Sequence, residues 1–314
     1  MKSLKLLAGC LQNQDLLNFF QSGYKEQSKH ISSTLIHQIA SLTEYQDSAG
    51  FSVCKYARDC DKAPCDWSNT ALYFMLQSLN QTERFQLLMT RDSDGNTPLH
   101  LLKSGAILPF IFEMLQDGYK KMSLLMARNH CGDSLLHVIG DISSRVIQAF
   151  FNTPSEHITH LLSLQNFQGD TILHKCLSGI CPYNIVSLVE CLYPLVTNKR
   201  CFTLTNRSNC NFIHQLLDVF ERNRSKAEFF PTLPPPIERF VSLFISSPEV
   251  LDELFQTQNI DGDTAMHLLA RFNHPLIPAL LIMSDRLVSC LQIPDRNGNT
   301  PIHFFAGNNA AFLI

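Results

Sequence analysis

The stretch that decides the fold is Asp92-Ser-Asp-Gly-Asn-Thr-Pro-Leu-His100, because it returns five more times in altered form. Each copy has a tight-turn sequence, then a cap residue, apolar residues and a histidine. The other copies are NHCGDSLLH at 129–137, NFQGDTILH at 166–174, NRSNCNFIH at 206–214, NIDGDTAMH at 259–267 and DRNGNTPIH at 295–303. Successive histidines are 36 to 53 residues apart. Such self-similarity predicts a stack of repeated units, each of which buries its apolar face against its neighbours.

The residue types in this repeated nine-residue sequence, called the phrase below, predict its local structure. Gly95 and its equivalents supply the positive φ that a tight turn needs, and Asn209 takes this place in the fourth copy. The next Thr or Ser, such as Thr97, has a hydroxyl that can accept hydrogen bonds from free N–H groups at a helix start. Pro98 and Pro301 lie in the first helical turn, where the missing N–H costs nothing. A helix is therefore expected to begin directly after each turn.

Turn, cap, apolar residues and histidine together resemble the start of an ankyrin repeat, although every unit here is longer than the usual length of roughly 33 residues. The resemblance implies an all-α fold, an ankyrin-repeat solenoid of stacked helix pairs with β-turn fingers and about six to seven repeats. It also implies that the six histidines are hydrogen-bonded between adjacent repeats. Besides its two helices, each unit contains a third apolar segment, such as ERFQLLMTRD or KKMSLLMARN, which leads into the next turn. This additional segment accounts for the long repeat period. The expected helix pairs are about 97–104 and 108–117, 134–140 and 143–152, and 171–178 and 183–194.

The chain is expected to consist of a helical N-terminal cap, residues 1–45, and an ankyrin-repeat domain, residues 46–314. Residues 46–91 are interpreted as a degenerate first repeat. The four prolines within 224–239 cannot continue a helix and predict a projecting loop or a rigid spacer. Residues 295–314 are interpreted as an incomplete last repeat, so that the chain either ends on an exposed apolar helix or is cut from a longer protein.

The composition is typical of a soluble globular protein and disfavours two classes of partner. The 25 basic residues are scattered among 28 acidic ones, so no basic surface for nucleic acid is expected. No apolar run approaches the roughly 18 residues of a membrane span. The segment from Leu7 to Cys10 resembles a lipoprotein cleavage site, but too few residues precede it to form the apolar part of a signal peptide.

Cysteine and histidine usage predicts neither a metal site nor catalysis. Most of the eleven cysteines fall at apolar helix positions, as do Cys176, Cys191 and Cys290, which predicts buried free thiols and a reducing, cytosolic place of action. The run Cys54, Cys60 and Cys65 lacks the paired spacing and the fourth ligand of a zinc site. No nucleotide-binding, metalloprotease or hydrolase motif is present. We therefore expect no enzyme, no catalytic residue and no cofactor within these residues.

The ankyrin resemblance implies that a partner protein binds the concave side, formed by the turn tips and the exposed faces of the first helices. Phe167 and Ile260 stand out among the tips, because an apolar tip gains nothing in water unless a partner covers it. The candidate partner-binding residues are Asp94, His130, Phe167, Gln168, Arg207, Ile260, Asp261, Arg296 and Asn297.

The function expected from the sequence is a protein–protein interaction scaffold. The irregular repeats, the low charge and the many Asn, Gln, Ser and Phe residues are similar to those of ankyrin effectors that bacteria secrete into host cells, where the partner is a host protein. One alternative is a eukaryotic or viral ankyrin regulator similar to the inhibitors of NF-κB. Another is the substrate-recruiting arm of an enzyme whose catalytic domain lies beyond Ile314.

Overall fold

The computed structural model describes six stretches of the chain and Ala40. The stretches are 71–102, 107–139, 155–177, 193–224, 243–271 and 285–308. They fall in two compact units, Met1–Thr153 and Pro154–Ile314, which are described one at a time. Apart from Ala40, the expected N-terminal cap lies outside the described residues, as do residues 46–70 and the proline-rich segment 225–239.

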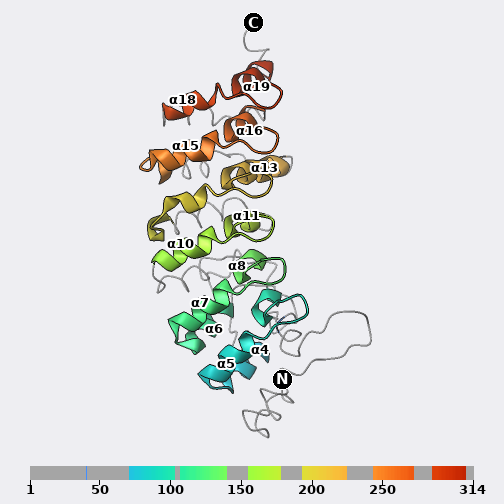
Figure 1. The fold of residues 1–314 in the computed structure, drawn as a ribbon, viewed down its shortest axis with the longest axis vertical. Coiled ribbons are helices and arrows are strands. Elements are labelled where there is room, and N and C mark those ends of the chain that lie inside the picture. Colours follow the sequence, from blue (N-terminus) through green and yellow to red (C-terminus); the bar gives the residue numbers. More distant parts are fainter. Residues whose placement is uncertain are drawn as a thin grey trace, which may run out of the picture. The chain divides into compact units, whose positions relative to one another are not determined.

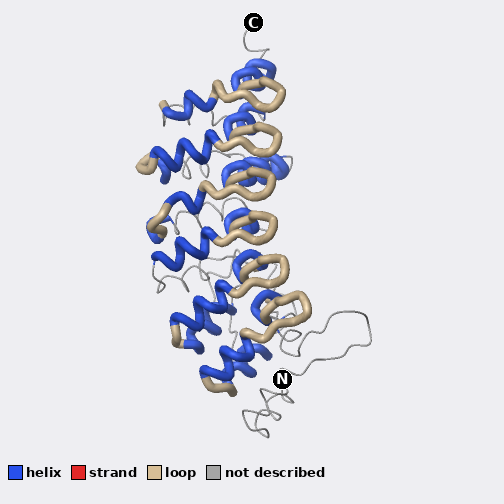
Figure 2. Tube along the Cα trace, viewed as in Figure 1, coloured by secondary structure: helices blue, strands red, loops and turns tan. Residues whose placement is uncertain are grey.

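Each repeat is organised around a finger, the name used here for the six residues from the Asp or Asn that opens the phrase to its cap residue. Figure 2 shows each finger as a loop between two helices. The helix before a finger is called the outer helix, and the helix after it the inner helix. The fingers are 92–97 and 129–134 in the first unit, and 166–171, 206–211, 259–264 and 295–300 in the second.

The first unit contains two fingers and six described helices, labelled in Figure 1 where there is room. In chain order these are α4 (Ala71–Gln77), α5 (Gln81–Leu88), η3 (Pro98–Leu101), α6 (Leu108–Leu115), α7 (Gly118–Met126) and α8 (Leu135–Val138). The outer helix α5 begins at a capping box, in which Asn80 Oδ1 accepts from the N–H groups of Thr82 and Glu83 and the Glu83 carboxylate accepts from Asn80 N–H.

The second unit repeats the same order around four fingers. Its described helices are α10 (Ser155–Ser163), α11 (Ile172–Cys176), η5 (Tyr193–Leu195), η6 (Lys199–Phe202), α13 (Phe212–Arg224), α15 (Pro248–Gln256), α16 (Ala265–Arg271), α18 (Arg286–Cys290) and α19 (Pro301–Asn308). The third apolar pieces noticed in the sequence are thus helical and form the outer helices. Within the described ranges there is no β-sheet, and extended pairing is limited to two isolated bridges, Arg128 with Ser134 and Gln165 with Thr171.

The predicted helix starts are confirmed, but the first three inner helices are shorter than expected, since α8 ends at Val138 instead of 140 and α11 at Cys176 instead of 178. Instead of an α-helix over 97–104, the chain forms the four-residue 3₁₀ helix η3, and Leu102 is already extended. Ser104 and Gly105, which follow, are poor helix formers and do not favour its continuation. The expected helices over 143–152 and 183–194 lie outside the described residues, apart from residues 193 and 194, which belong to η5.

Apolar side chains of the outer helices supply much of the core. In the second unit Leu254 and Phe255 of α15 are fully buried. Phe202 of η6 packs edge-on against Phe244, with ring centroids 5.4 Å apart, and Tyr193 of η5 meets the same Phe244 ring at 5.0 Å. These contacts fix the end of the outer helix η6, and with it the start of the finger 206–211 that follows. None of the helices in the described ranges is both long and apolar enough to cross a bilayer.

Candidate functional site: a ladder of fingers

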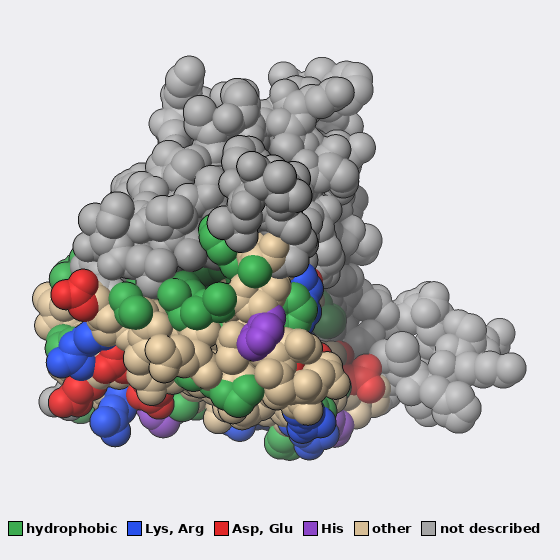
Figure 3. Space-filling view, turned by 90° about the horizontal axis from the view of Figure 1, so that it is seen from above, with side chains coloured by type: hydrophobic (Ala, Val, Ile, Leu, Met, Phe, Trp, Pro, Cys, Tyr) green, Lys and Arg blue, Asp and Glu red, His purple; other side chains and the backbone are tan. Residues whose placement is uncertain are grey.

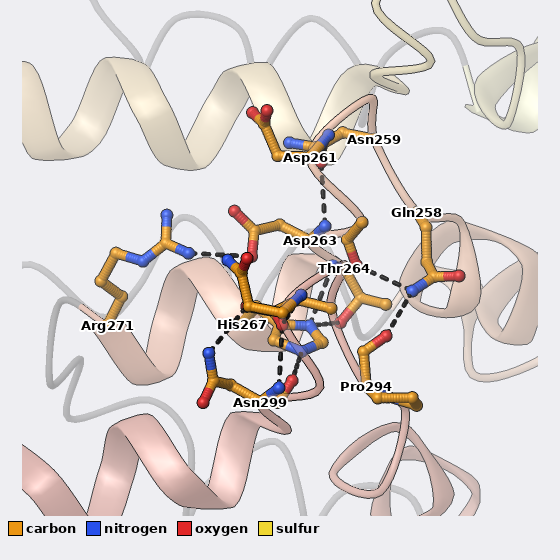
Figure 4. A network of polar contacts seen from close by, with 12 residues as sticks. Gln258, Asn259, Asp261, Asp263, Thr264, His267, Arg271, Pro294 and Asn299 are labelled. Carbon is orange, nitrogen blue, oxygen red and sulfur yellow. Dashed lines mark hydrogen bonds and ion pairs between the residues drawn. The ribbon is translucent and has the colours of Figure 1, made fainter.

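The Asp or Asn that opens each finger holds the turn closed. In the third finger of the second unit, Asn259 Oδ1 accepts from the N–H groups of Asp261 and Asp263, both at 2.9 Å (Figure 4). Gly262 N–H then donates to Asn259 O at 3.0 Å, and Gly262 has φ of 80°. The two side-chain bonds recur in all six fingers, accepted by Asp92, Asn129, Asn166, Asn206, Asn259 and Asp295.

Positive φ at the turn glycines was predicted and is confirmed, including at Asn209, which has φ of 55°. The role of the opening Asp or Asn was missed. Its signal was in the sequence, because one of these two residues opens all six phrases and their short side chains can bond to the backbone two residues on.

The phrase histidine joins one repeat to the next. The backbone N–H of Thr264 donates to His267 Nδ1 at 3.0 Å, and the Thr264 hydroxyl oxygen lies 2.8 Å from the same ring nitrogen. Because Nδ1 accepts, the neutral ring carries its proton on Nε2, which donates to Asn299 O of the following finger at 3.1 Å (Figure 4). Equivalent bonds link His100 to Asp133 O, His174 to Cys210 O and His214 to Asp263 O. The predicted inter-repeat role is confirmed for these four histidines.

A second link between repeats comes from the residue directly before the finger. Gln258 Nε2 donates to Gly262 O of its own finger at 2.8 Å and to Pro294 O of the next repeat at 2.7 Å (Figure 4). Gln165 makes the same pair of bonds to Gly169 O and Thr205 O. In the first unit Arg91 bonds to Gly95 O and Arg128 O. The residue at this position varies from one repeat to another, and no role was predicted for it.

The finger tips themselves form a backbone ladder. The N–H of the second residue of one finger donates to the carbonyl of the third residue of the preceding finger. The bonds are His130 to Asp94 in the first unit, and Arg207 to Gln168, Ile260 to Ser208 and Arg296 to Asp261 in the second, the first three at 2.9 Å and the last at 3.4 Å. Successive tips are therefore held in a defined register.

Arg271 of α16 adds a further link between the last two repeats. The Asp263 side chain is 4% exposed and accepts from Arg271 at 2.8 Å. The Arg271 guanidinium also lies 4.9 Å from the centre of the Phe304 ring on α19.

The last finger of the second unit differs from the others because no described finger follows it. His303 is exposed and keeps its bonds to Thr300, and no described residue accepts from its Nε2. Ile302 is 50% exposed beside it. Figure 3 looks onto this end of the second unit and shows hydrophobic side chains next to a histidine. This end supplies control positions for substitutions inside the stack.

All nine candidate partner-binding residues lie at finger tips and are exposed. Asp94 and His130 belong to the first unit and are joined by one bond of the ladder. The other seven occupy the four consecutive fingers of the second unit. The two large apolar tips, Phe167 and Ile260, are 57% and 52% exposed.

The three buried thiols of the described residues are poorly suited to nucleophilic chemistry. Burial raises the pKa of Cys176 and of Cys201 to about 12, and that of Cys290 to about 11, so these thiols stay protonated at neutral pH. Cys54, Cys60, Cys65 and Cys191 lie outside the described residues. In the part of the chain that the structure describes, no three His, Cys, Asp or Glu side chains are grouped as metal ligands.

Buried histidines predict a loss of stability in mild acid. Burial lowers the pKa of His214 from 6.5 to about 4, with smaller effects of His174 and His267 in the same direction, and burial also lowers the pKa of His100 and His174. Between pH 6.5 and 4 the unfolded chain therefore binds more protons than the folded chain, so stability is complete above pH 6.5 and falls as the pH drops. For His214 alone we expect a loss of about 2 kcal/mol by pH 5.

Urea denaturation followed by circular dichroism at pH 7.5, 6 and 5 measures this loss. His214→Gln retains a hydrogen-bonding side chain but does not titrate, so its stability should depend less steeply on pH. An unchanged slope in this variant would contradict the assignment to His214.

Comparison with known proteins does not identify a function for this chain. No protein-family model matches the chain, and no curated protein matches its sequence. Among solved structures the chain is similar to the ankyrin repeat domain of Bcl-3, described as a unique member of the IkappaB protein family, with 15% sequence identity and a TM-score of 0.31. The match covers 68% of this chain and 95% of that one. Similarity at this level assigns neither a partner nor a function.

The class of protein follows from the repeat itself. A finger stands between an outer and an inner helix, and its histidine is bonded to the next finger. The unit has the turn and the helix start that the sequence phrases predicted, and the described residues form a helical repeat protein.

Proposed function

We propose that this chain is a scaffold that binds a partner protein across its finger tips. The observation that carries the proposal is the exposure of Phe167 and Ile260, two large apolar side chains at tips whose backbone is held by the ladder. Exposed apolar side chains on a rigid surface are suited to binding, because little conformational entropy is lost when the partner covers them.

The chemistry of the described residues favours binding over catalysis. Four of the six phrase histidines connect repeats, and the buried thiols have a raised pKa. The proposed partner-binding residues remain Asp94, His130, Phe167, Gln168, Arg207, Ile260, Asp261, Arg296 and Asn297.

The proposal extends to a biological setting. We propose that the scaffold is a secreted bacterial effector that acts on a host protein in the host cytosol. Its support is compositional: irregular repeats with low charge and many Asn, Gln, Ser and Phe residues.

Removing both apolar tips should abolish partner capture without unfolding the protein. We expect Phe167→Ala combined with Ile260→Ser to reduce capture at least tenfold, while helical content and melting temperature stay nearly unchanged, because both side chains are more than half exposed. The measurement is affinity capture from a eukaryotic cytosolic lysate, with bound proteins identified by mass spectrometry.

The matched control removes an exposed aromatic residue and an exposed isoleucine away from the tips. Tyr119 on α7 is 84% exposed and Ile245 is 44% exposed. Tyr119→Ala combined with Ile245→Ser should leave capture intact. Equal capture by the wild type and the tip variant would refute the assignment of the binding face.

A further inference from the structure

The tips of the second unit alternate in chemistry. At the second position of its four consecutive fingers, the residues are Phe167, Arg207, Ile260 and Arg296. An apolar side chain thus alternates with a basic one at a spacing of one repeat. All four are exposed. A partner that covers the whole row must present apolar and acidic groups in the same alternation.

The ladder keeps this row in register and limits how it can be recognised. The N–H groups of Arg207, Ile260 and Arg296 are already bonded to the preceding finger. They are therefore not available to pair with a strand of a partner, and recognition has to come from the side chains.

The two tip arginines differ from the other arginines of this unit whose side chains are described. Arg271 pairs with Asp263 and Arg286 with Asp252, at 2.8 and 2.7 Å. Arg200 lies 4.0 Å from carboxylate oxygens of two glutamates. Among the described residues, neither Arg207 nor Arg296 has a carboxylate within ion-pairing distance, and both are exposed. These two guanidinium groups are available to an acidic partner.

The spacing of the row selects the conformation of that partner. Adjacent repeats pack helix against helix, which sets their separation at about 8–10 Å. A polyproline II segment rises about 3.1 Å per residue with three residues per turn, so that every third side chain lies on one face, about 9 Å from the last. A β-strand has the same reach over three residues, but its side chains alternate between faces every second residue. Polyproline II therefore matches the row in both distance and facing.

We infer that the partner segment is a polyproline II stretch of at least ten residues, in which apolar and acidic side chains alternate at every third position. The apolar side chains cover Phe167 and Ile260, and the carboxylates pair with Arg207 and Arg296. In the opposite chain direction the order of the side chains is reversed, and a ten-residue segment shifted by one position then matches three of the four tips. It rests on the proposed function, and it names the chemistry of the partner.

The test uses a labelled synthetic peptide, Leu-Pro-Pro-Glu-Pro-Pro-Leu-Pro-Pro-Glu, and the full-length chain, with binding followed by fluorescence polarisation. The control peptide, Leu-Pro-Pro-Leu-Pro-Pro-Glu-Pro-Pro-Glu, has the same composition and the same polyproline II propensity but lacks the alternation. We expect the alternating peptide to bind at least fivefold more tightly, and its binding to weaken as salt is raised. Equal binding of the two peptides, or binding of neither, would overturn the inference.

Charge exchange identifies the residues involved. Arg207→Gln combined with Arg296→Gln should weaken binding of the alternating peptide about tenfold. The matched control, Arg200→Gln combined with Arg286→Gln, removes two arginines from the outer side of the same unit and should leave binding unchanged. Arg207→Glu combined with Arg296→Glu should prefer a peptide in which lysine replaces both glutamates. Failure of this exchange in a variant with unchanged melting temperature would overturn the inference.

The outcomes for the inference and for the proposed function can be told apart. If the peptides fail but capture of a partner protein is lost in the variant with Phe167→Ala and Ile260→Ser, the polyproline II partner is refuted and the scaffold stands. If capture also survives that variant, the binding face itself is refuted.

Discussion

Replacing His267 with alanine is expected to lower the free energy of unfolding of the full-length chain by about 4 kcal/mol. The ring is fully buried. Its loss leaves the Thr264 N–H and hydroxyl and the Asn299 carbonyl without their partner, and it also opens a cavity between two repeats. Urea denaturation followed by circular dichroism measures the change.

His303→Ala is the matched control for this prediction. His303 makes the same bonds to Thr300 within its repeat, but it is exposed and no described residue accepts from its Nε2. We expect its loss to cost about 1 kcal/mol. An equal loss for the two substitutions would show that the bond to the next finger contributes nothing to stability.

Gly262→Ala is expected to destabilise the chain by about 3 kcal/mol, for two separate reasons. Gly262 has φ of 80°, a conformation that alanine adopts only with strain. A Cβ atom at this position would also lie 2.6 Å from Arg296 N, a backbone atom of the next finger. The two fingers would have to separate, which breaks the bond from Arg296 N–H to Asp261 O.

Gly298→Ala separates the two reasons. Gly298 has φ of 81°, but an added Cβ would meet nothing within 4 Å. This substitution should therefore cost only the strain of the turn, about 1 kcal/mol. Thermal unfolding of the two variants side by side measures the difference. If both shift the melting temperature equally, close packing of the fingers is not what requires glycine at position 262.

The links between fingers also bear on binding. Each pair of neighbouring fingers in the second unit is joined by a tip bond and a histidine bond, and two of the three pairs also by a glutamine. A partner that docks on such a row does not have to order it. Substitutions that loosen the ladder, such as Gly262→Ala, should therefore weaken partner binding even though they leave every tip side chain in place.

Several features of the repeat could be predicted from the sequence because they depend on residues close together in the chain. The turn glycines, Asn209, and the helix starts after the fingers follow from backbone preferences of single residues. The recurrence of the six histidines predicted a structural role for them, and the bond to the next repeat, which the ankyrin resemblance implied, is confirmed for His100, His174, His214 and His267. The opening Asp or Asn belongs to the same class, since its bonds span only two and four residues, and it could have been predicted from its presence in all six phrases.

Other features depend on residues brought together only by stacking. Nothing local to Gln258 indicates that its amide meets Pro294 O, which lies 36 residues further along the chain. The backbone bonds between finger tips could not be predicted from local sequence either. Their register depends on where each outer helix ends relative to the preceding finger. Whether a tip arginine is paired is likewise decided by the neighbouring repeat: Arg271 finds Asp263, whereas Arg207 and Arg296 find no carboxylate among the described residues.

The sequence by itself thus determined the kind of repeat, the positions of its turns and the residues at its tips, because the backbone conformation of a finger is set by residues within six positions of one another. Only the tertiary structure decided which tips are joined, which side chains remain exposed and which charges remain unpaired. These properties arise from contacts between residues 30 or more positions apart, whose pairing depends on helix packing and on the varied lengths of chain between the fingers.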